Sequence, residues 1–506
     1  MLSKNKKILK LLKHYKQISL LGKVSAVLGW DLNVNLPPKA SVGRSQQAAY
    51  LAELGTKLWK NEEFKKGIEE FKVNDPQLTP EEKAIIRNLQ HGLKFYTKIP
   101  EALIVEREKV TSQAFMAWQK AKIENKYTDF APFLKKIVEL SQRMAKHLEY
   151  QQNPYDALLD LFEPGLTAAD CKKMFNATKP SLTQLIQRVQ KSKGYNPVNP
   201  LAEGKIQYSI PDQKKLAHFI MQRMGYDMQA GRLDISAHPF TTTLADRNDI
   251  RITTNFKEND FREAFTATVH ETGHGLYEQN VNPDYDDSPL SGGVSLGIHE
   301  AMSRFYENQI GKHPQFLEFM TPLFQAFFPE QLQETTPEVI TKLFNTVKPS
   351  FIRIEADEVT YSLHIVLRFE MEDDLINGRI KVEDAPEVWN EKMKKYFGIA
   401  PKTDTEGVLQ DVHWSYGSIG YFPAYALGNL YGSQLFAKMK KEISVDEELR
   451  HGNLGVITSW LKENVYKHGS MLWPKEVIKN ATKKDLDSQY FIDYLEEKYS
   501  KIYKLK

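Results

Sequence analysis

His270-Glu271-Thr272-Gly273-His274 lies inside a helical pattern that runs from residue 260 to residue 279, and it decides how the rest of the chain is interpreted. At about 100° per residue, two histidines four positions apart lie about 40° apart on a helix, one turn above the other. Both imidazoles can therefore reach one metal ion. Glu271 points to the neighbouring face, where its carboxylate can take a proton from a water molecule bound to that ion. The stretch predicts a metal centre with a general base beside it.

A coincidental match is the main alternative to this interpretation. With 13 histidines in 506 residues, His-Glu-x-x-His is expected by chance at most about 4 times per 100 chains of this composition. The spacing therefore favours a zincin site, in which such a helix holds a catalytic zinc ion. Gly273 and Gly275 each cost the helix roughly 1 kcal/mol relative to alanine. We expect them to permit close packing near the ion.

A catalytic zinc ion normally has three protein ligands and one open position, so a third donor is needed. Residues 297–304, Gly-Ile-His-Glu-Ala-Met-Ser-Arg, begin a second helical pattern after a turn-rich stretch at 282–293. That loop is long enough to bring the second helix back beside the first. Glu300 is the predicted third ligand and completes the two-histidine, one-glutamate set of the gluzincins. His299 is its rival. The alternative is that Glu300 is a solvated helix carboxylate and His299 a core histidine.

The composition excludes several classes of partner. The chain has 506 residues, 41% of them hydrophobic and 26% charged, which is typical of an ordinary soluble protein. Its 68 basic side chains exceed its 65 acidic ones by only three. The chain therefore lacks the strong overall positive charge that is typical of proteins that bind nucleic acid or an anionic membrane. No run of about 18 apolar residues occurs, so no segment is expected to span a membrane.

Cys171 is the only cysteine, so neither an intrachain disulfide nor a thiolate metal cage can form. Any soft-metal site must therefore use histidines and carboxylates. Lys4, Lys6 and Lys7 could suggest the start of a signal peptide. Further lysines interrupt every candidate apolar core, however, and the apolar residues fall at helical spacing, which favours an amphipathic helix of the mature chain. We expect a cytoplasmic protein.

Helical periodicity covers most of the sequence and predicts a mainly α fold. The strongest stretches lie near 5–28, 43–73, 80–96, 101–124, 129–151 and 167–192. Alternation typical of strands occurs at 205–210 and 249–256, which predicts one small sheet. The sequence has no internal repeat and no long linker. Residues 1–506 are therefore expected to form a single domain, which can consist of two lobes flanking a central groove.

Several further motifs occur in order along almost the whole chain. They are Trp30-Asp31, Pro37-Pro38, Arg44, His238-Pro239-Phe240, Asp249-x-Arg251-x-Thr253, the zincin pentapeptide, His299-Glu300, Ile354-x-x-Asp357 and Gly407-x-x-Gln410-Asp411-x-His413-Trp414. Together they make the chain resemble the carboxypeptidase Taq family of metallocarboxypeptidases. Ala301 and Met302 depart from the serine expected after His-Glu in that family.

The resemblance implies a large helical metallopeptidase of the neurolysin-like gluzincin type, with a deep groove and a small β-sheet beside the zincin helix. It also implies an enzyme that removes residues one at a time from peptide C-termini with one zinc ion per chain, or cobalt in its place. Its partners are then peptides with a free C-terminal carboxylate and a second copy of the chain in a homodimer.

Amide hydrolysis also needs hydrogen-bond donors for the negative charge that develops on the carbonyl oxygen. His413 and Tyr421 are the predicted donors, because an imidazole and a phenol can both donate a hydrogen bond. Tyr425 is the reserve candidate. The alternative is that the aromatic-rich stretch at 414–425 simply packs in the core.

A carboxypeptidase must hold the free α-carboxylate of its substrate. Arginine suits this role, because its planar fork binds a carboxylate with two hydrogen bonds. Arg353 is the first candidate, ahead of Arg251 and Arg304. The alternative for Arg353 is an ion pair with Asp357, expected four residues later on the same helix face. Arg251 is more easily interpreted as a brace of the site through Asp249.

The strand pattern at 249–256 predicts an exposed sheet edge along which an extended peptide could bind through its backbone. Because such binding ignores side chains, it predicts broad specificity. His238, just upstream, is a candidate for the wall of the substrate pocket. A proline-enforced turn with a packed phenylalanine explains its His-Pro-Phe stretch equally well. Glu307 is interpreted as a solvated helix carboxylate without a role.

Three functions agree with these observations. The first is a metal-dependent carboxypeptidase in which Glu271 activates the attacking water. The second is an endo-acting oligopeptidase on a similar scaffold, which should accept a C-terminally amidated peptide where a carboxypeptidase stalls. The third is a non-catalytic helical protein whose His270 and His274 bind no metal, or bind a structural ion closed by a fourth protein ligand.

Overall fold

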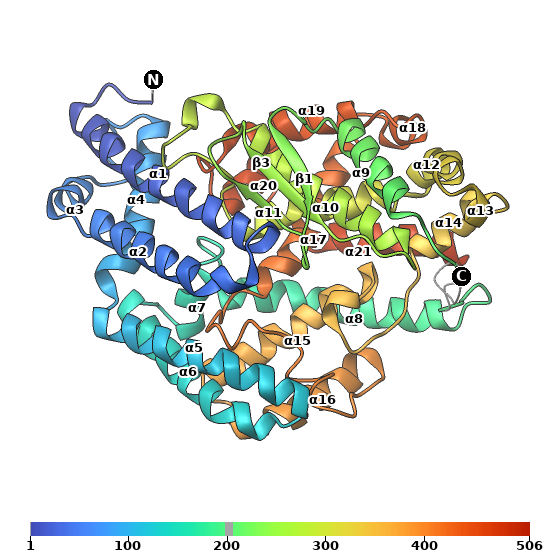
Figure 1. Ribbon diagram of the computed structural model, residues 1–506, viewed down its shortest axis with the longest axis horizontal. Coiled ribbons are helices and arrows are strands. Elements are labelled where there is room, and N and C mark those ends of the chain that lie inside the picture. The colour runs from blue at the N-terminus through green and yellow to red at the C-terminus, as the bar shows by residue number, and fades with distance from the viewer. Residues whose placement is uncertain (1, 198–205, 506) are drawn as a thin grey trace.

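Helices account for most of the chain in the computed structural model, which describes residues 2–197 and 206–505 (Figure 1). The predicted mainly α fold with one small sheet is confirmed. Among the described residues, no helix combines the length and the apolar character that crossing a membrane would need. The buried apolar side chains form one cluster that extends from Ile8 to Tyr503. The single domain over residues 1–506, with or without two lobes, stays a prediction.

The first part of the chain is helical at nearly all the predicted places. The helices are α1 (Lys6–Val34), α2 (Ser41–Trp59), α3 (Glu62–Glu69), α4 (Pro80–Lys98), α5 (Glu101–Glu124), α6 (Tyr127–Leu148), α7 (Pro154–Leu159) and α8 (Ala168–Gln190). The single helical stretch predicted at 43–73 is wrong. Asn61 separates α2 from α3, because its side chain accepts a hydrogen bond from the backbone N–H of Phe64 and caps a new helix there.

Three short strands form one sheet in the order β1 (Gly231–Ile235), β3 (Ile250–Thr254), β2 (Thr241–Thr243). β1 is parallel to β3, and β2 is antiparallel to it. β3 is therefore the central strand. The exposed edge predicted for residues 249–256 is wrong, because both sides of that strand are already paired.

The strand predicted at 205–210 is wrong for the residues that are described. Lys205 lies outside them, residues 206–209 carry no strand, and Ile210 begins helix α9 (Ile210–Met224). The reason is local. The side chain of Ser209 accepts a hydrogen bond from the backbone N–H of Asp212, and Pro211 occupies the first helical turn, where proline is favourable.

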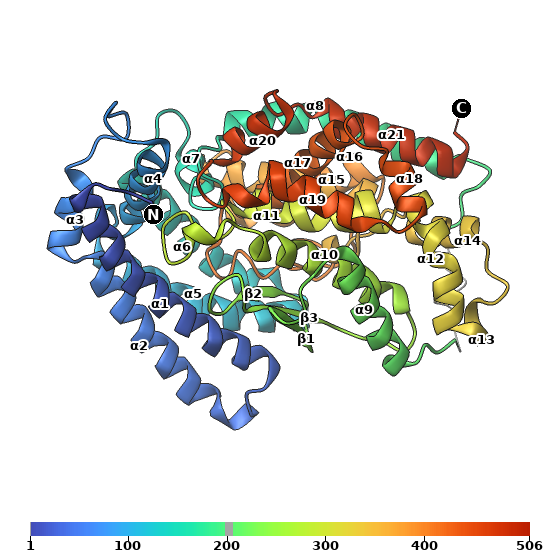
Figure 2. The same cartoon turned by 90° about the horizontal axis from the view of Figure 1, so that it is seen from above.

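The helix that carries the zincin motif, α10 (Phe261–Gln279), lies between the sheet and α11 (Leu296–Arg304) (Figure 2). The expectation that Gly273 permits close packing is confirmed. A Cβ atom at this position would lie 2.6 Å from the carbonyl oxygen of Met302 and 2.8 Å from the Cα of Ser303. Gly273 therefore allows the backbone of α11 to approach α10 directly.

α11 continues into a π-helical turn at Phe305–Gly311, and the remaining helices follow this turn in the chain. They are α12 (Pro314–Phe327), α13 (Pro329–Leu332), α14 (Pro337–Phe344), α15 (Glu358–Ile376), α16 (Ala385–Phe397), α17 (Pro423–Met439), α18 (Val445–Arg450), α19 (Leu454–Asn464), α20 (Pro474–Thr482) and α21 (Gln489–Tyr503). In Figure 2 the sheet, α10, α11, α17 and α21 follow one another as layers, and each contacts the next. The zincin helix and α11 thus lie in the middle of the molecule.

Candidate metal centre

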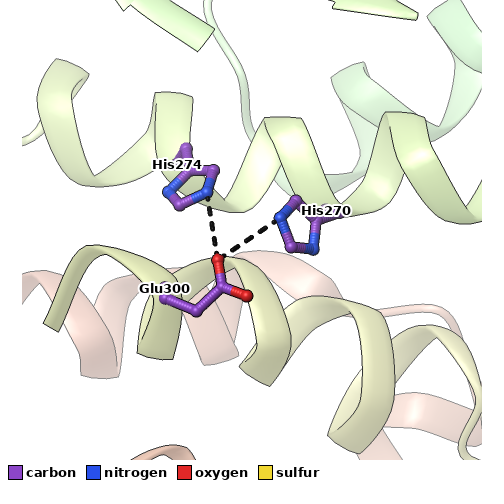
Figure 3. Close-up of side chains that lie close together, drawn as sticks. All are labelled: His270, His274 and Glu300. Carbon is purple, nitrogen blue, oxygen red and sulfur yellow. Dashed lines mark ion pairs between the residues drawn. The ribbon is translucent and has the colours of Figure 1, made fainter. Parts of the chain in front are cut away.

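The three predicted ligands come together between α10 and α11 (Figure 3). The Nε2 atoms of His270 and His274 each lie 3.6 Å from Oε2 of Glu300. One ligand atom from each residue lies within 4.8 Å of the other two. The histidines project from one face of α10, a turn apart, as their spacing predicts, and Glu300 reaches them from α11.

This donor set suits a single divalent metal ion. Zinc binds histidine nitrogen at about 2.0–2.1 Å and carboxylate oxygen at about 2.0–2.2 Å, which places two donors of a tetrahedral site about 3.4 Å apart. The two separations of 3.6 Å between nitrogen and carboxylate oxygen agree with this value. Three donors leave one position of a tetrahedral ion open, as a catalytic site requires.

Arg304 orients the carboxylate of Glu300. Its Nε donates to Oε1 of Glu300 at 2.7 Å, which leaves Oε2 facing the two histidines. Burial raises the pKa of Glu300, but the charges of Arg304 and the histidines outweigh it and hold that pKa well below its ordinary value. Glu300 is therefore an anion. Arg304, considered above as an anchor for the carboxylate of the substrate, already donates its hydrogen bonds to Glu300 and Glu307.

Glu307, which sequence reasoning dismissed as solvated, lies in the π-helical turn and is buried against His270. Its Oε2 accepts a hydrogen bond from Nδ1 of His270 at 2.8 Å. Arg304 and Lys312 donate to its carboxylate at 3.0 and 2.7 Å. With the proton on Nδ1, the Nε2 lone pair of His270 is free to bind a metal ion. The spacing of seven residues from Glu300 is two helical turns, a signal that could have identified Glu307.

His299, the rival ligand, lies behind His274 rather than among the three candidate ligands. Its Nε2 donates to Oε1 of Glu278 at 2.7 Å, so its Nδ1 is free to accept a hydrogen bond. Nδ1 of His274 lies 2.9 Å from that atom and donates to it. Burial lowers the pKa of His274, which keeps its imidazole neutral. As with His270, the Nε2 lone pair of His274 is left for a metal ion.

Glu271 is buried beside the candidate ligands, and strand β2 holds it there. Oγ1 of Thr241 donates to Oε2 of Glu271 at 2.7 Å and lies 2.9 Å from its backbone carbonyl oxygen. Only one carboxylate oxygen is bonded in this way. No pattern in the sequence indicated Thr241, because the contact joins a strand to a helix thirty residues later.

The structure brings His413, Tyr421 and Tyr425 together at the start of α17. The ring of His413 lies 5.3 Å from that of Tyr421, and its Nε2 lies 3.4 Å from the hydroxyl of Tyr425. Burial lowers the pKa of His413 to about 4, because its effect outweighs the nearby charge of Asp411, which raises that pKa, and Arg353 and Arg368 lower it as well. His413 is therefore a neutral imidazole at pH 7.

A buried carboxylate on α15, which sequence reasoning missed, fixes the loop that carries His413 and Tyr421. Glu372 accepts hydrogen bonds from Nε1 of Trp414 at 2.8 Å and from the backbone N–H of Gly420 at 2.9 Å. Trp414 itself is only 4% exposed, so the core-packing interpretation of the aromatic stretch holds for this residue. Glu372 therefore holds the loop at two points, Trp414 and Gly420, on either side of residues 415–419.

The ion pair predicted between Arg353 and Asp357 is wrong. Arg353 lies in a 3-10 turn, Ala356 is extended, and Asp357 instead caps α15 by accepting from the N–H of Val359 and Thr360. The two residues therefore do not share a helix face. Arg353 pairs with Asp411, its Nε donating to Oδ1 at 2.9 Å.

Asp411 also binds a second guanidinium group. Nε of Arg368 donates to Oδ2 of Asp411 at 2.6 Å. Burial raises the pKa of Asp411, but Arg368 and Arg353 outweigh it and keep the carboxyl ionised. Two cations share one anion, which leaves one net positive charge. Arg353 is 6% exposed and Arg368 is not exposed at all, so only Arg353 can offer that charge to a ligand.

Arg251 and His238 lie on the sheet side of the site. The brace expected between Arg251 and Asp249 is confirmed, with Nε donating to Oδ1 at 2.8 Å, and the guanidinium also lies 4.4 Å from the ring centre of Trp30. His238 is exposed, and its backbone carbonyl accepts a hydrogen bond from Ser236. Within the described part of the chain, neither side chain hydrogen-bonds to the three candidate ligands.

Comparison with known proteins identifies this architecture. Residues 10–499 match the family described as Carboxypeptidase Taq (M32) metallopeptidase. The chain belongs to this family. The M32 chain is 39% identical to Thermostable carboxypeptidase 1 of Pyrococcus furiosus over 497 residues, which cover 98% of it and 99% of that protein. It is 38% identical to Carboxypeptidase 1 of Bacillus subtilis over 491 residues, 97% of each chain.

Solved structures of M32 enzymes have the same fold. The Pyrococcus furiosus carboxypeptidase described as Apo-Mg matches with a TM-score of 0.95 at 39% identity, covering 99% of this chain and 100% of that one. Metallocarboxypeptidase 1 of Trypanosoma cruzi matches with a TM-score of 0.93 at 33% identity, covering 98% and 99%. The predicted family and helical gluzincin-like fold are confirmed.

The predicted activity is confirmed with the family. This M32 protein is a metallocarboxypeptidase, a peptide hydrolase that uses a metal cofactor. The endo-acting and non-catalytic alternatives are not favoured, because its relatives are carboxypeptidases along their whole length.

Proposed function

We propose that this M32 carboxypeptidase holds one zinc ion per chain between His270, His274 and Glu300 and releases single amino acids from peptide C-termini. One observation carries the proposal. Both Nε2 atoms lie 3.6 Å from the same carboxylate oxygen, and each ligand has a hydrogen-bond partner on its far side that aims it inward. Cobalt, which accepts the same donors, is the alternative ion.

Glu271 is the general base of the proposed reaction. When bound at this site, zinc would lower the pKa of a coordinated water toward neutrality and polarise the scissile carbonyl. Glu271 takes a proton from the attacking water on its carboxylate and passes it to the nitrogen of the leaving amine. The hydrogen bond from Thr241 to Oε2 fixes the direction in which the other carboxylate oxygen points.

His413 and Tyr421 donate hydrogen bonds to the negative charge that develops on the carbonyl oxygen. Burial raises the pKa of Tyr421, so its hydroxyl keeps the proton that it donates. His413 is neutral at pH 7 and has one ring N–H to give. Tyr425, next to His413, is the reserve donor.

Arg353 holds the terminal carboxylate of the substrate. The net positive charge that it shares with Arg368 and Asp411 supports this role, and its planar fork fits a carboxylate. Because Arg353 binds the terminal carboxylate and not a side chain of the substrate, we expect broad specificity for the C-terminal residue. Arg251 and His238 contribute indirectly, by shaping the sheet side of the substrate channel.

A mass ladder from one synthetic peptide tests the reaction. We expect stepwise loss of single residues from the free peptide and none from its C-terminally amidated twin. A chelator should stop the ladder, and zinc or cobalt should restore it. Glu271→Gln should keep its metal but lose turnover at least a thousandfold, whereas the exposed control Glu330→Gln should behave as the wild type. Full turnover by Glu271→Gln would overturn the mechanism.

The role of Arg353 has its own test. Arg353→Gln removes the cation while keeping a hydrogen-bonding side chain. We expect kcat/KM for free peptides to fall about a hundredfold, the effect of losing a charged pair at a carboxylate. The preference for free over amidated peptides should shrink with it. An unchanged preference would assign the carboxylate to another residue.

We also propose that the enzyme is a homodimer of the cytoplasm. Large apolar side chains exposed on α1 and α2, among them Leu20, Val24 and Tyr50, support a face for a second subunit. Cys171, buried and free, agrees with a reducing compartment. Light scattering that gives the mass of a single chain at micromolar concentration would contradict the dimer.

A further inference from the structure

A cavity of about 370 Å³ adjoins the predicted oxyanion donors, a volume within the range of ligand pockets. Phe162 lines it and lies 5.2 Å from the ring of Tyr421. Tyr421 in turn lies 5.2 Å from Tyr425, and the guanidinium of Arg353 lies 5.0 Å from the ring centre of Tyr425. One wall residue of the cavity, Phe162, thus contacts a predicted oxyanion donor, and three successive side-chain contacts lead from that wall to Arg353.

The walls of the cavity come from the N-terminal helices α4, α5, α6 and α7 on one side and from the loop before Tyr421 on the other. Its apolar lining consists of Phe95, Tyr96, Met144, Leu158, Leu161, Phe162 and Ile419. The loop is held against the helices by Arg107, which donates to the carbonyl oxygens of Tyr416 and Gly417 at 3.1 and 3.3 Å.

The two basic groups of the lining, His91 and Arg107, already have partners. Nε2 of His91 lies 3.1 Å from the carboxylate of Asp160, and Arg107 pairs with Glu108 besides the two carbonyl groups. A charged ligand would therefore find no free counter-charge here, and it would lose its hydration. An apolar ligand gains roughly 25 cal/mol for each Å² that it removes from water. The chemistry of the lining selects an apolar or aromatic group.

We infer that this cavity is a subsite for a large apolar side chain of the peptide, on the N-terminal side of the cleaved bond. The inference rests on the proposed function, which puts the terminal carboxylate at Arg353 and the scissile carbonyl near Tyr421. A peptide that runs from Arg353 to Tyr421 continues toward Phe162, because each residue advances it by at most about 3.6 Å. The enzyme thus accepts many C-terminal residues but selects for bulk one or two positions upstream.

A second cavity lies next to the first. It has a volume of about 200 Å³ and shares His91 and Gly92 with the first. Tyr15 and Trp59, from the first two helices, line its far side. The two cavities are therefore neighbours, and under this inference the second would receive the N-terminal part of longer substrates.

The test is a positional scan with the zinc-loaded wild-type enzyme. Peptides of five residues carry either alanine or phenylalanine at each position in turn. We expect kcat/KM to rise about tenfold or more with phenylalanine at one or two positions upstream of the cleaved bond, the gain from burying a large apolar side chain. Glutamate at the same positions should lower it below the alanine peptide. Equal rates for alanine and phenylalanine at every upstream position would overturn the inference.

Two variants locate the preference. Leu161→Trp, at a half-buried wall position, fills the cavity, and Phe95→Ala widens it. The readout is kcat/KM for the phenylalanine peptide divided by kcat/KM for the alanine peptide. We expect this ratio to fall to about two or less in Leu161→Trp. In Phe95→Ala we expect it to fall at least threefold from the wild-type value. Ile123→Trp adds the same ring at a position on α5 that is 85% exposed, and it should keep the wild-type ratio. A wild-type ratio in both cavity variants would place the selection elsewhere.

The outcomes separate this inference from the proposed function. If the wild-type enzyme trims no peptide in a chelator-sensitive way, the proposed function fails. If it trims the alanine and phenylalanine peptides alike, only the subsite fails. The melting temperature of each variant shows whether it folds. If one of them does not fold, the other still tests the subsite, because one variant fills the cavity and the other widens it.

Discussion

Glu163 accepts a hydrogen bond from the backbone N–H of Gly297 at 2.8 Å, at the start of the helix that carries Glu300. Tyr431 donates a second hydrogen bond to it at 2.9 Å, and the residue is only 2% exposed. A hydrogen-bond acceptor is favourable at this end of a helix, because the first N–H groups have no partner within it. Glu163 therefore holds the first turn of α11, whose N-cap is Ser295, and supports the helix that carries Glu300.

The stability of the protein should depend on pH through Glu163. Burial raises its pKa from 4.5 to about 7. Between these values the folded protein binds more protons here than the unfolded chain, so this residue makes stability fall as pH rises from 4.5 through 7. Glu163→Gln cannot ionise and lacks this component, which is of the order of a few kcal/mol. Calorimetry should show that the wild type loses stability relative to Glu163→Gln between pH 5 and pH 8. If the difference in unfolding free energy between the two proteins is the same at both pH values, the raised pKa of Glu163 is contradicted.

Glu307 should control how tightly the metal is held. Glu307→Gln keeps the size of the side chain but replaces the anion that accepts the Nδ1 hydrogen of His270. Losing such a partner typically costs 10-fold to 100-fold in metal affinity. Competition with a coloured chelator measures this affinity without any substrate. Glu330→Gln, a change of the same kind at an exposed position, is the control. Equal metal affinities in the two variants would show that Glu307 does not control metal binding.

Thr241 should act on turnover rather than on substrate binding. Thr241→Val removes the hydroxyl that donates to Oε2 of Glu271 and leaves the shape of the strand unchanged. We expect kcat to fall about tenfold with little change in KM, since the loss of one hydrogen bond of this kind is worth about 1–1.5 kcal/mol. Thr241→Ser should recover most of the rate. The neighbouring Thr242→Val should not change it, and a rise in KM alone would argue against positioning of the base.

Gly273 should be needed for the packing of α10 on α11. Gly273→Ala places a methyl group 2.6 Å from the carbonyl oxygen of Met302, a distance that forces the two helices apart. Overpacking of this kind costs about 1–3 kcal/mol. Gly29→Ala, in α1 with nothing within 4 Å, is the matched control and should stabilise the protein by up to about 1 kcal/mol. Thermal unfolding of the two variants should therefore shift in opposite directions.

The sequence predicts the features of this site that depend on helical spacing. His270, His274 and Glu271 follow directly from the geometry of one helix, and Glu300 follows from the need for a third ligand on the next. Glu307 was missed, although its spacing from Glu300 carries the same signal, because an isolated helix carboxylate is usually solvated. The mainly α fold was predictable for the same reason, since its amphipathic helices repeat every 3.6 residues.

Contacts between distant segments could not be predicted. Arg353 and Asp357 looked like a helical pair, but an extended residue separates them, and the partner of Arg353 is Asp411, more than fifty residues away. β3 looked like an edge, since nothing in its own sequence reveals that strands pair on both of its sides. A single sequence records which residues favour a strand or a helix, and not which segments meet.

The bond between Glu163 and Gly297 joins residues 134 positions apart. A ribosome delivers the N-terminal helices first, so the acceptor is already synthesised when α11 leaves the exit tunnel. A fragment that starts after residue 163 would contain every candidate ligand and still lack the acceptor of the Gly297 N–H at the start of α11. The proposed metal site is therefore supported from a part of the chain that contributes none of its ligands.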